Sequence, residues 1–298
     1  MYYIAYAFFY LLSLIPWRIL YFIADGLYGL VYYIFGYRKN IVFQNLAIAF
    51  PEKTPAERVR IAKDFYHNFI DTLLETIKMI SISNKELAKR FTCNVEVLND
   101  LYATDLNVQV VCGHFFNWEF VNLGIAKMCL FPFVGVYQPL TNKTINKIIY
   151  NMRAKNGTIL VPASDFKNNF HAYVKDRYVL GLAADQNPPN PAKAHWVSFF
   201  NRLTPFVVGP EKGAKMNNTA MVFAHFYKLR RGYYHAQLTR ITLNPNAFEN
   251  GQLTQIFAQY VEQAVRKEPA NYLWSHRRWK FDFNEEKFGS LVVKQKPN

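Results

Sequence analysis

From residue 108 onward, short runs of apolar residues alternate with longer stretches in which apolar positions recur every three or four residues. Short apolar runs bounded by turn residues are typical of buried strands, and the longer periodic stretches are typical of helices. The predicted strands are 108–112, 133–137, 158–161, 178–184, 220–225 and 233–241. The predicted helices are 117–129, 142–155, 164–176, 206–217 and 252–267. This alternation predicts an α/β fold with a central, largely parallel sheet flanked by helices.

A long amphipathic helix is predicted ahead of this region. Thr54 is a suitable N-cap, Pro55 stands at the first helical position, and Glu57 completes a capping box. Apolar residues then recur at helical spacing, at Ile61, Phe65, Phe69, Leu73, Ile77 and Ile80. Because no repeat, low-complexity tract or linker interrupts the chain, we expect residues 37–298 to form a single α/β domain.

The first 36 residues have a different character. Residues 1–17 and 26–37 carry no charge and are dense in aromatic side chains, with Pro16 as a predicted break. Neither piece alone reaches the roughly 20 residues that a spanning helix needs, and a basic n-region typical of a secretory signal is missing. Aromatic rings favour the headgroup level of a bilayer. We therefore predict that residues 1–36 anchor the protein in or on an anionic membrane, with a pair of buried core helices as the alternative.

Charge and cysteine content narrow the classes of partner. Lysine and arginine number 35 against 21 acidic residues, a formal net charge of +14, which favours anionic partners such as nucleic acid, lipid headgroups or an acidic carrier protein. The positive charge is dispersed and no nucleic-acid-binding module is recognisable, so nucleic acid is not expected. Cys93, Cys112 and Cys129 lack metal-ligand spacing, which predicts buried thiols in a reducing compartment and no metal site.

The segment Val-Cys-Gly-His-Phe-Phe-Asn-Trp-Glu-Phe, residues 111–120, carries the candidate chemistry. Gly113 permits a tight turn after the predicted strand, and Asn117 can cap a helix whose first turn contains Glu119. His114 would then lie at the exit of a strand, where open α/β sheets usually hold ligands. A histidine oriented by an acid can remove a proton from a hydroxyl group. The alternative is a partly buried structural histidine.

Several short segments, in this order and spacing, resemble the lysophospholipid acyltransferase superfamily, and within it the late acyltransferases of lipid A biosynthesis. The similarity extends from about residue 11 to residue 280. It is carried by residues 11–18, 45–51, 113–119, 184–186, 199–205, 209–210 and 274–280.

The resemblance implies transfer of a fatty acyl chain to a hydroxyl of a glycolipid, a lipid A precursor, at the cytoplasmic face of the bacterial inner membrane. The implied donor is a thioester of acyl carrier protein or coenzyme A, and no cofactor is expected. His114 would be the general base. By analogy with the family's His-x4-Asp/Glu motif, Glu119 would hold the other ring nitrogen and stabilise the imidazolium.

Four further residues are candidates for substrate or oxyanion contacts. Arg153, or backbone N–H groups near Gly209, could stabilise the oxyanion, and Asn117 belongs to the motif but could simply shape the turn. If its strand is parallel to strand 108–112, Asp185 should emerge on the same edge as His114, as a second acid or a loop cap. Apart from these four, Arg277, Arg278 and Lys280 could contact anionic headgroups or a carrier phosphate, or could simply be surface charges.

Departures from the family pattern bear on the acceptor. The glycerolipid branch usually carries a Pro-Glu-Gly-Thr block where residues 161–165 read Val-Pro-Ala-Ser-Asp, which favours a glycolipid acceptor. A glycerolipid or aminolipid acceptor, a thioesterase or hydrolase using the same His-Glu pair, and a non-catalytic basic binding protein remain as alternatives. Neither a Gly-x-Ser-x-Gly nor an HExxH motif is present. Acyl chain length and the acylated position are not encoded in any recognisable motif.

Overall fold

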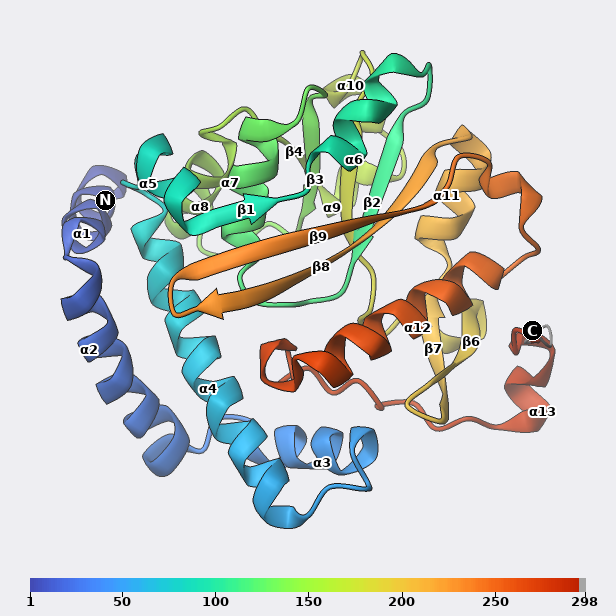
Figure 1. Ribbon diagram of the computed structural model, residues 1–298, viewed down its shortest axis with the longest axis horizontal. Helices are drawn as coiled ribbons and strands as arrows, with labels where there is room; N and C mark the ends of the chain where they lie inside the picture. Colours follow the sequence, from blue (N-terminus) through green and yellow to red (C-terminus); the bar gives the residue numbers. More distant parts are fainter. Residues whose placement is uncertain (295–298) are drawn as a thin grey trace.

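The computed structural model, which describes residues 1–294, is built around a seven-stranded sheet in the order β1-β9-β8-β2-β5-β3-β4 (Figure 1). Every neighbouring pair in it is parallel except β8 and β9, which are antiparallel. This confirms the predicted α/β class and mostly parallel sheet. The strands are β1 (Phe91–Cys93), β2 (Val108–Cys112), β3 (Phe133–Tyr137), β4 (Ile159–Pro162), β5 (Val179–Ala183), β8 (Ala220–Arg230) and β9 (Tyr233–Thr242).

Helices cover both faces of this sheet. Successive side chains of a strand point to opposite faces. In β2, Val110 faces the side on which helix α7 packs, whereas the Gln109 amide donates to the carbonyl of Pro210, in α11, on the other side. The longer helices of the α/β region are α3 (Lys39–Ala49), α4 (Pro55–Lys78), α7 (Trp118–Met128), α8 (Lys143–Ala154), α11 (Gly209–Asn217) and α12 (Gln252–Lys267). The shorter ones are α5 (Asn84–Arg90), α6 (Glu96–Asn99), α9 (Ala163–Phe166), α10 (Phe170–Tyr173) and α13 (Glu285–Phe288).

Two predicted helices differ from those observed. The stretch 164–176 forms two four-residue turns, α9 and α10, because Asp165 accepts bonds from Ser164 and Tyr173 and the polar residues after it favour turns over helix interior. The predicted helix 206–217 begins only at Gly209, since the preceding residues belong to a strand.

That strand is part of a hairpin that the sequence pattern did not predict. Strands β6 (Ala194–Phe199) and β7 (Arg202–Val207) form a separate antiparallel pair. Phe200 and Asn201 turn the chain with φ values of 53° and 55°, both in the left-handed region. A phenylalanine at such a position is uncommon, so the usual Asn-Gly hairpin signal is missing here.

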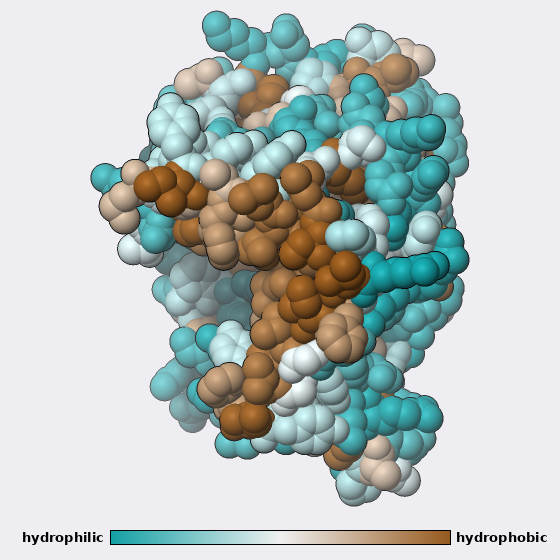
Figure 2. All heavy atoms as spheres, turned by 90° about the vertical axis from the view of Figure 1, so that its left-hand side faces the viewer, coloured by the Kyte–Doolittle hydropathy of each residue, from teal (hydrophilic) through white to brown (hydrophobic). Residues whose placement is uncertain are grey.

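The N-terminal segment forms helices α1 (Tyr2–Leu14) and α2 (Trp17–Gly29), with the break at Pro16, and a π-helical continuation, η1 (Leu30–Phe35). Of the helices in residues 1–294, Trp17–Phe35 alone is long and apolar enough to cross a membrane. One face of α2 packs on α4 through Leu20, Ala24 and Tyr28, while its other face leaves large apolar side chains exposed. Figure 2 shows the resulting apolar band on this side of the molecule.

Candidate active site

The His114 turn lies where the sequence placed it, between the end of β2 and the start of α7. Gly113 is needed here for close approach. A Cβ atom on Gly113 would lie 2.9 Å from the ring of Phe115 and 3.3 Å from Val261 of α12. The turn therefore presents His114, whose side chain is about one quarter exposed, at the carboxyl edge of the sheet.

Asp185 holds the His114 ring. Strands β2 and β5 are parallel neighbours with Cys112 opposite Ala183, so the residues that follow them emerge side by side, as predicted for Asp185. Its Oδ1 lies 2.5 Å from His114 Nδ1 and accepts the His114 backbone N–H at 3.1 Å. The carboxylate is 1% exposed. Burial acts to raise the pKa of Asp185, but the facing His114 ring and hydrogen bonds from His114 and Tyr272 outweigh it and lower the pKa to about 2.

Glu119 does not occupy the place on the His114 ring that the sequence analysis assigned to it. It emerges from the first turn of α7 toward α8, where Arg153 Nη2 donates to Glu119 Oε1 at 2.6 Å and Nε donates to both carboxylate oxygens at 3.1 Å. The indole of Trp118 donates to the same carboxylate at 3.0 Å. Glu119 and Arg153 thus form one bidentate pair, separate from the His114–Asp185 pair.

Asn117 caps α7, as predicted, but does not reach the substrate side of the turn. Its Oδ1 accepts the backbone N–H of Glu119 at 3.2 Å, and its buried amide donates to Glu75 Oε2 at 2.8 Å. The side-chain oxygen and nitrogen of Asn117 therefore both form hydrogen bonds within the protein.

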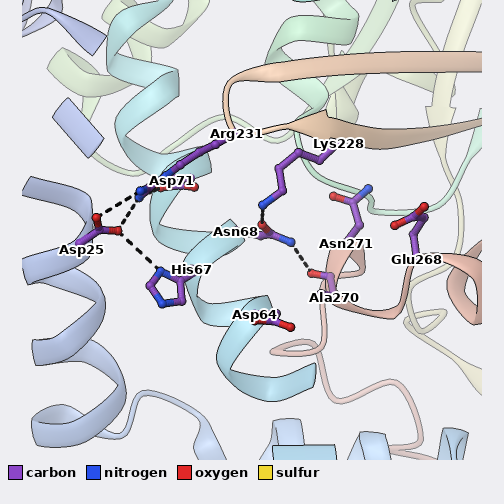
Figure 3. Close-up of a pocket in the computed structure, with 10 residues that line it drawn as sticks. All are labelled: Asp25, Asp64, His67, Asn68, Asp71, Lys228, Arg231, Glu268, Ala270 and Asn271. Carbon is purple, nitrogen blue, oxygen red and sulfur yellow. Dashed lines mark hydrogen bonds and ion pairs between the residues drawn. The ribbon is translucent and has the colours of Figure 1, made fainter. Parts of the chain in front are cut away.

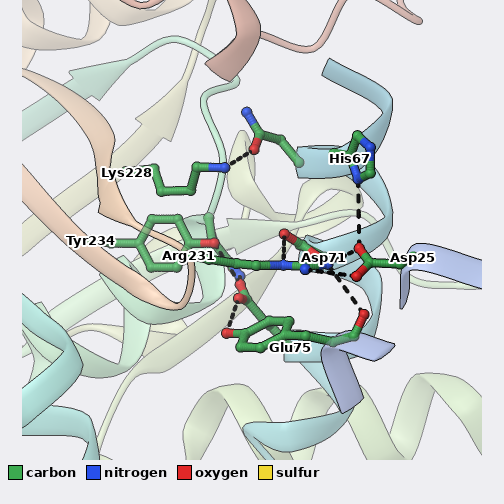
Figure 4. A network of polar contacts seen from close by, with 10 residues as sticks. Asp25, His67, Asp71, Glu75, Lys228, Arg231 and Tyr234 are labelled. Carbon is green, nitrogen blue, oxygen red and sulfur yellow. Dashed lines mark hydrogen bonds and ion pairs between the residues drawn. The ribbon is translucent and has the colours of Figure 1, made fainter. Parts of the chain in front are cut away.

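Glu75, on α4, is a residue that the sequence analysis missed. It is completely buried and accepts hydrogen bonds from the hydroxyls of Tyr21 and Tyr234, both at 2.7 Å, as well as from Asn117. Figure 4 shows Glu75 beside Tyr234. Burial raises the pKa of Glu75 to about 7 against the opposing effect of these hydrogen bonds. Glu75 follows the buried Ile61 and Asn68 at intervals of about four and two helical turns, which puts an acid on the buried face of α4 and is a signal that could have revealed it.

An apolar cavity of about 380 Å³ opens beside these groups. Its polar rim includes His114, Glu119 and Arg153. Its apolar walls come from β2, β3, β4, β5 and α7, namely Val110, Gly135, Leu160, Gly181, Val121 and Ile125 among others. A ligand that fits this cavity has a long apolar portion and a reactive polar end near His114.

Two other candidates lie elsewhere. Gly209 does not line this cavity, because the start of α11 packs near Gln109, toward the opposite end of β2 from His114. Arg278 is buried rather than on the surface. Its guanidinium donates to Asn187 at 3.0 Å and to the carbonyl of Pro205 at 3.0 Å, which ties the loop after Asp185 to the C-terminal segment.

The described residues contain no group of three or more histidine, cysteine or acidic side chains arranged to hold a metal ion. The chemistry available at the cavity is therefore that of an imidazole held by a buried carboxylate, with a guanidinium on the same rim.

Comparison with known proteins gives consistent matches. The family model described as bacterial lipid A biosynthesis acyltransferase matches residues 1–281. The chain is 24% identical over 275 residues to a lipid A biosynthesis lauroyltransferase of Escherichia coli (strain K12), which covers 89% of this chain and 87% of that protein. It is also 24% identical over 256 residues to a lipid A biosynthesis palmitoleoyltransferase of the same strain, covering 82% and 79%. A lipid A biosynthesis acyltransferase of Shigella flexneri matches to the same extent.

Proposed function

The chain belongs to the bacterial lipid A biosynthesis acyltransferase family, and on that premise we propose that it is an acyltransferase acting on a lipid A precursor. It moves a fatty acyl chain from an acyl carrier protein thioester to a hydroxyl of that precursor. His114 acts as the general base. The reaction would take place at the cytoplasmic face of the bacterial inner membrane and needs no cofactor. The observation that carries the proposal is the His114–Asp185 pair at the rim of an apolar cavity. The acyl chain occupies the cavity, and its thioester carbonyl lies near the imidazole.

The contact between Asp185 and Nδ1 determines which nitrogen does the chemistry. With the Nδ1 proton donated to Asp185, Nε2 of neutral His114 has a free lone pair for the proton of the acceptor hydroxyl. The hydroxyl oxygen then attacks the thioester carbonyl, and Asp185 stabilises the imidazolium that forms. Collapse of the tetrahedral intermediate breaks the carbon–sulfur bond, and the imidazolium returns the proton to the leaving thiolate. A direct transfer of this kind needs no covalent acyl-enzyme.

Arg153 is the best-placed donor for the oxyanion or for a substrate phosphate. Its guanidinium lines the cavity, is about one quarter exposed, and is fixed by Glu119. The facing Glu119 carboxylate raises the pKa of Arg153 against the opposing effect of burial, so it stays charged. One such preorganised donor contributes about 3 kcal/mol to transition-state stabilisation. We therefore assign Glu119 the role of holding Arg153.

The membrane and carrier parts of the proposal rest on surface properties. Helices α1 and α2 expose large apolar side chains, including Ile4, Phe8, Phe22 and Ile23. The net charge of +14 favours both an anionic lipid surface and an acidic carrier protein.

The experiment that tests the proposal is an assay of the purified full-length protein in detergent with a panel of acyl carrier protein thioesters, with and without a lipid A precursor. Mass spectrometry should detect addition of one acyl mass to the glycolipid. The product should be lost in His114→Ala and retained in His171→Ala, which alters an exposed histidine of α10. Release of free fatty acid alone would support a thioesterase instead. Transfer from coenzyme A thioesters only, or only to a glycerolipid or aminolipid, would overturn the proposed donor or acceptor.

A further inference from the structure

A second cavity has a volume of about 410 Å³, and Figure 3 shows the residues that line it. Four elements contribute to it: α2, α4, β8 and the short 3₁₀ helix η5 (Pro269–Asn271). It shares none of its lining residues with the apolar cavity that contains His114. Its lining is polar, so its ligand has a different chemistry from that of an acyl chain.

The cavity is acidic although the chain as a whole is strongly basic. Four carboxylates line it, from Asp25, Asp64, Asp71 and Glu268, against the two basic side chains of Lys228 and Arg231. Arg231 is fully engaged, because it pairs with Asp25 and Asp71, each at 2.7 Å. In the part of the chain that the structure describes, the carboxylates of Asp64 and Glu268 form neither a hydrogen bond nor an ion pair. Two negative charges in this cavity are therefore available to a ligand.

A buried acceptor also faces the cavity. Asn271 is only 4% exposed, and its Nδ2 donates to the carbonyl of Phe226 at 2.5 Å, which fixes the orientation of the amide. Its Oδ1 has no hydrogen-bond partner and points into the cavity (Figure 3). A buried acceptor without a donor is unfavourable, and a ligand that donates a hydrogen bond would remove this cost.

The carboxylates of Asp64 and Glu268 and the Oδ1 atom of Asn271 thus favour a ligand that is positively charged and donates hydrogen bonds. A metal ion does not fit, because no set of three or more metal-ligating side chains is present in the described residues. An anionic lipid would be repelled by Asp64 and Glu268. Lys228 is directed toward Asn68, with which it forms a hydrogen bond, so it leaves the Asn271 side of the cavity to the acceptors. We propose that this cavity binds a ligand that carries a primary ammonium group.

The site is connected to the catalytic turn through the backbone of the same segment. The carbonyl of Asn271 accepts the N–H of Phe116 at 3.0 Å, and the N–H of Leu273 donates to the carbonyl of His114 at 3.1 Å. A ligand bound to the Asn271 side chain therefore contacts the segment that supports His114 from behind. The binding proposal itself does not depend on acyl transfer, and it can be tested without substrate.

Isothermal titration calorimetry of the full-length protein in detergent with 1,4-diaminobutane tests the proposal. We expect saturable binding, no binding of the neutral analogue 1,4-butanediol, and at least a tenfold weaker affinity in the double variant Asp64→Asn/Glu268→Gln. The matched control Asp105→Asn/Glu286→Gln neutralises two exposed acids elsewhere and should bind like the wild type. Absence of binding, equal binding by the double variant, or equal binding of Mg²⁺ would overturn the proposal.

The ammonium group could belong to a free amine or to a lipid headgroup, and vesicle binding separates the two. Phosphatidylethanolamine has N–H donors, whereas phosphatidylcholine has a quaternary nitrogen without them. A wild-type preference for phosphatidylethanolamine vesicles that disappears in Asp64→Asn/Glu268→Gln would identify the headgroup as the ligand. Diamine binding that depends on the two acids, without any vesicle preference, would identify a free amine.

Discussion

In the proposed mechanism, the His114 base depends on a single buried oxygen, Oδ1 of Asp185, which accepts hydrogen bonds from both the ring and the backbone of the histidine. Because the carboxylate is inaccessible to solvent, water cannot take over its role. The low pKa of Asp185 keeps this oxygen negatively charged throughout the neutral range. The charge is thus present before the proton transfer that it stabilises.

The variant Asp185→Asn separates this role from packing. An amide keeps the size of the side chain but lacks the charge that stabilises the imidazolium, so kcat should fall by about 10²- to 10⁴-fold with little change in KM. Steady-state kinetics of acyl transfer checks this. Glu119→Gln, which weakens only the hold on Arg153, should cost about 10- to 10²-fold. The reverse order of severity would return the role of ring partner to Glu119.

At the scale of elements, Glu75 joins four parts of the fold at one point. It projects from α4 and receives hydrogen bonds from α2, β9 and the residue that caps α7. The His114 turn and the apolar helix α2 therefore both form hydrogen bonds to the buried Glu75 carboxyl. A displacement of α2 would alter the hydrogen bonds of the Glu75 carboxyl, which contacts both Tyr21 of α2 and Asn117.

The raised pKa of Glu75 predicts a pH dependence of stability. Its carboxyl has a pKa of about 7 in the fold, against an ordinary glutamate value of 4.5, so between these two pH values the folded state holds a proton that the unfolded chain releases. The contribution of the Glu75 carboxyl to the free energy of unfolding is fully present below pH 4.5. It is lost as the pH rises to about 7, and the total loss is about 3 kcal/mol. Urea unfolding at pH 5 and pH 8 should show this loss in the wild type. Glu75→Gln should lack it, and an unchanged pH profile in that variant would assign the effect to another group.

The walls of the apolar cavity predict control of acyl chain length. A Cβ atom on Gly135 of β3 would lie 3.6 Å from Leu160 and Thr158, an ordinary contact distance, so a larger side chain fits without clashing and fills part of the cavity. Gly135→Val should shift the preference toward acyl chains shorter by a few carbons. Competition between mixed thioesters, read by mass spectrometry, measures the shift. Gly213→Ala on α11 is the control. A chain-length preference that is unchanged in both variants would show that the acyl chain binds outside this cavity.

Elements whose signals are local were predictable from the sequence. Strands β2 and β3 and helix α12 agree with prediction at both ends, because each has an uninterrupted pattern flanked by turn or capping residues. The short strand β1 and the β6–β7 hairpin were missed. Their stability comes from contacts with distant parts of the chain, such as the pairing of β1 with β9.

The same distinction applies to the candidate site. His114 and the cap at Asn117 follow from nearby residues, whereas the acid that reaches the ring is decided by the register between β2 and β5. Spacing along the chain favoured Glu119, which is close in sequence but points toward α8. Glu75 and Tyr272 come from elements far along the chain, and only the folded structure brings them to the turn.

At the scale of the whole molecule, the exposed face of α2 predicts membrane binding. Phe22 of α2 is 80% exposed, and Leu30, the first residue of η1, is 42% exposed. Burial of one large apolar side chain is worth about 1.5–3 kcal/mol, so Phe22→Glu/Leu30→Glu should weaken binding to anionic vesicles at least tenfold. Co-sedimentation with anionic vesicles measures this binding. Met216→Glu, at an exposed position on α11, should have no effect, and an equal loss in that variant would argue against α2 as the anchor.

The apolar helices and the groups that surround Asp185 lie far apart in the sequence and are therefore synthesised at different times. Helices α1 and α2 come first, while Tyr272, which bonds to Asp185, and Arg278, which ties down the loop after it, come close to the end. A ribosome makes them in that order, so the apolar surface emerges long before the groups that hold the Asp185 carboxylate in place. A copy truncated before Tyr272 has the apolar helices but lacks the hydroxyl that supports Asp185. Under the proposed mechanism, such a copy would keep the apolar surface but would lack a group that supports the His114 base.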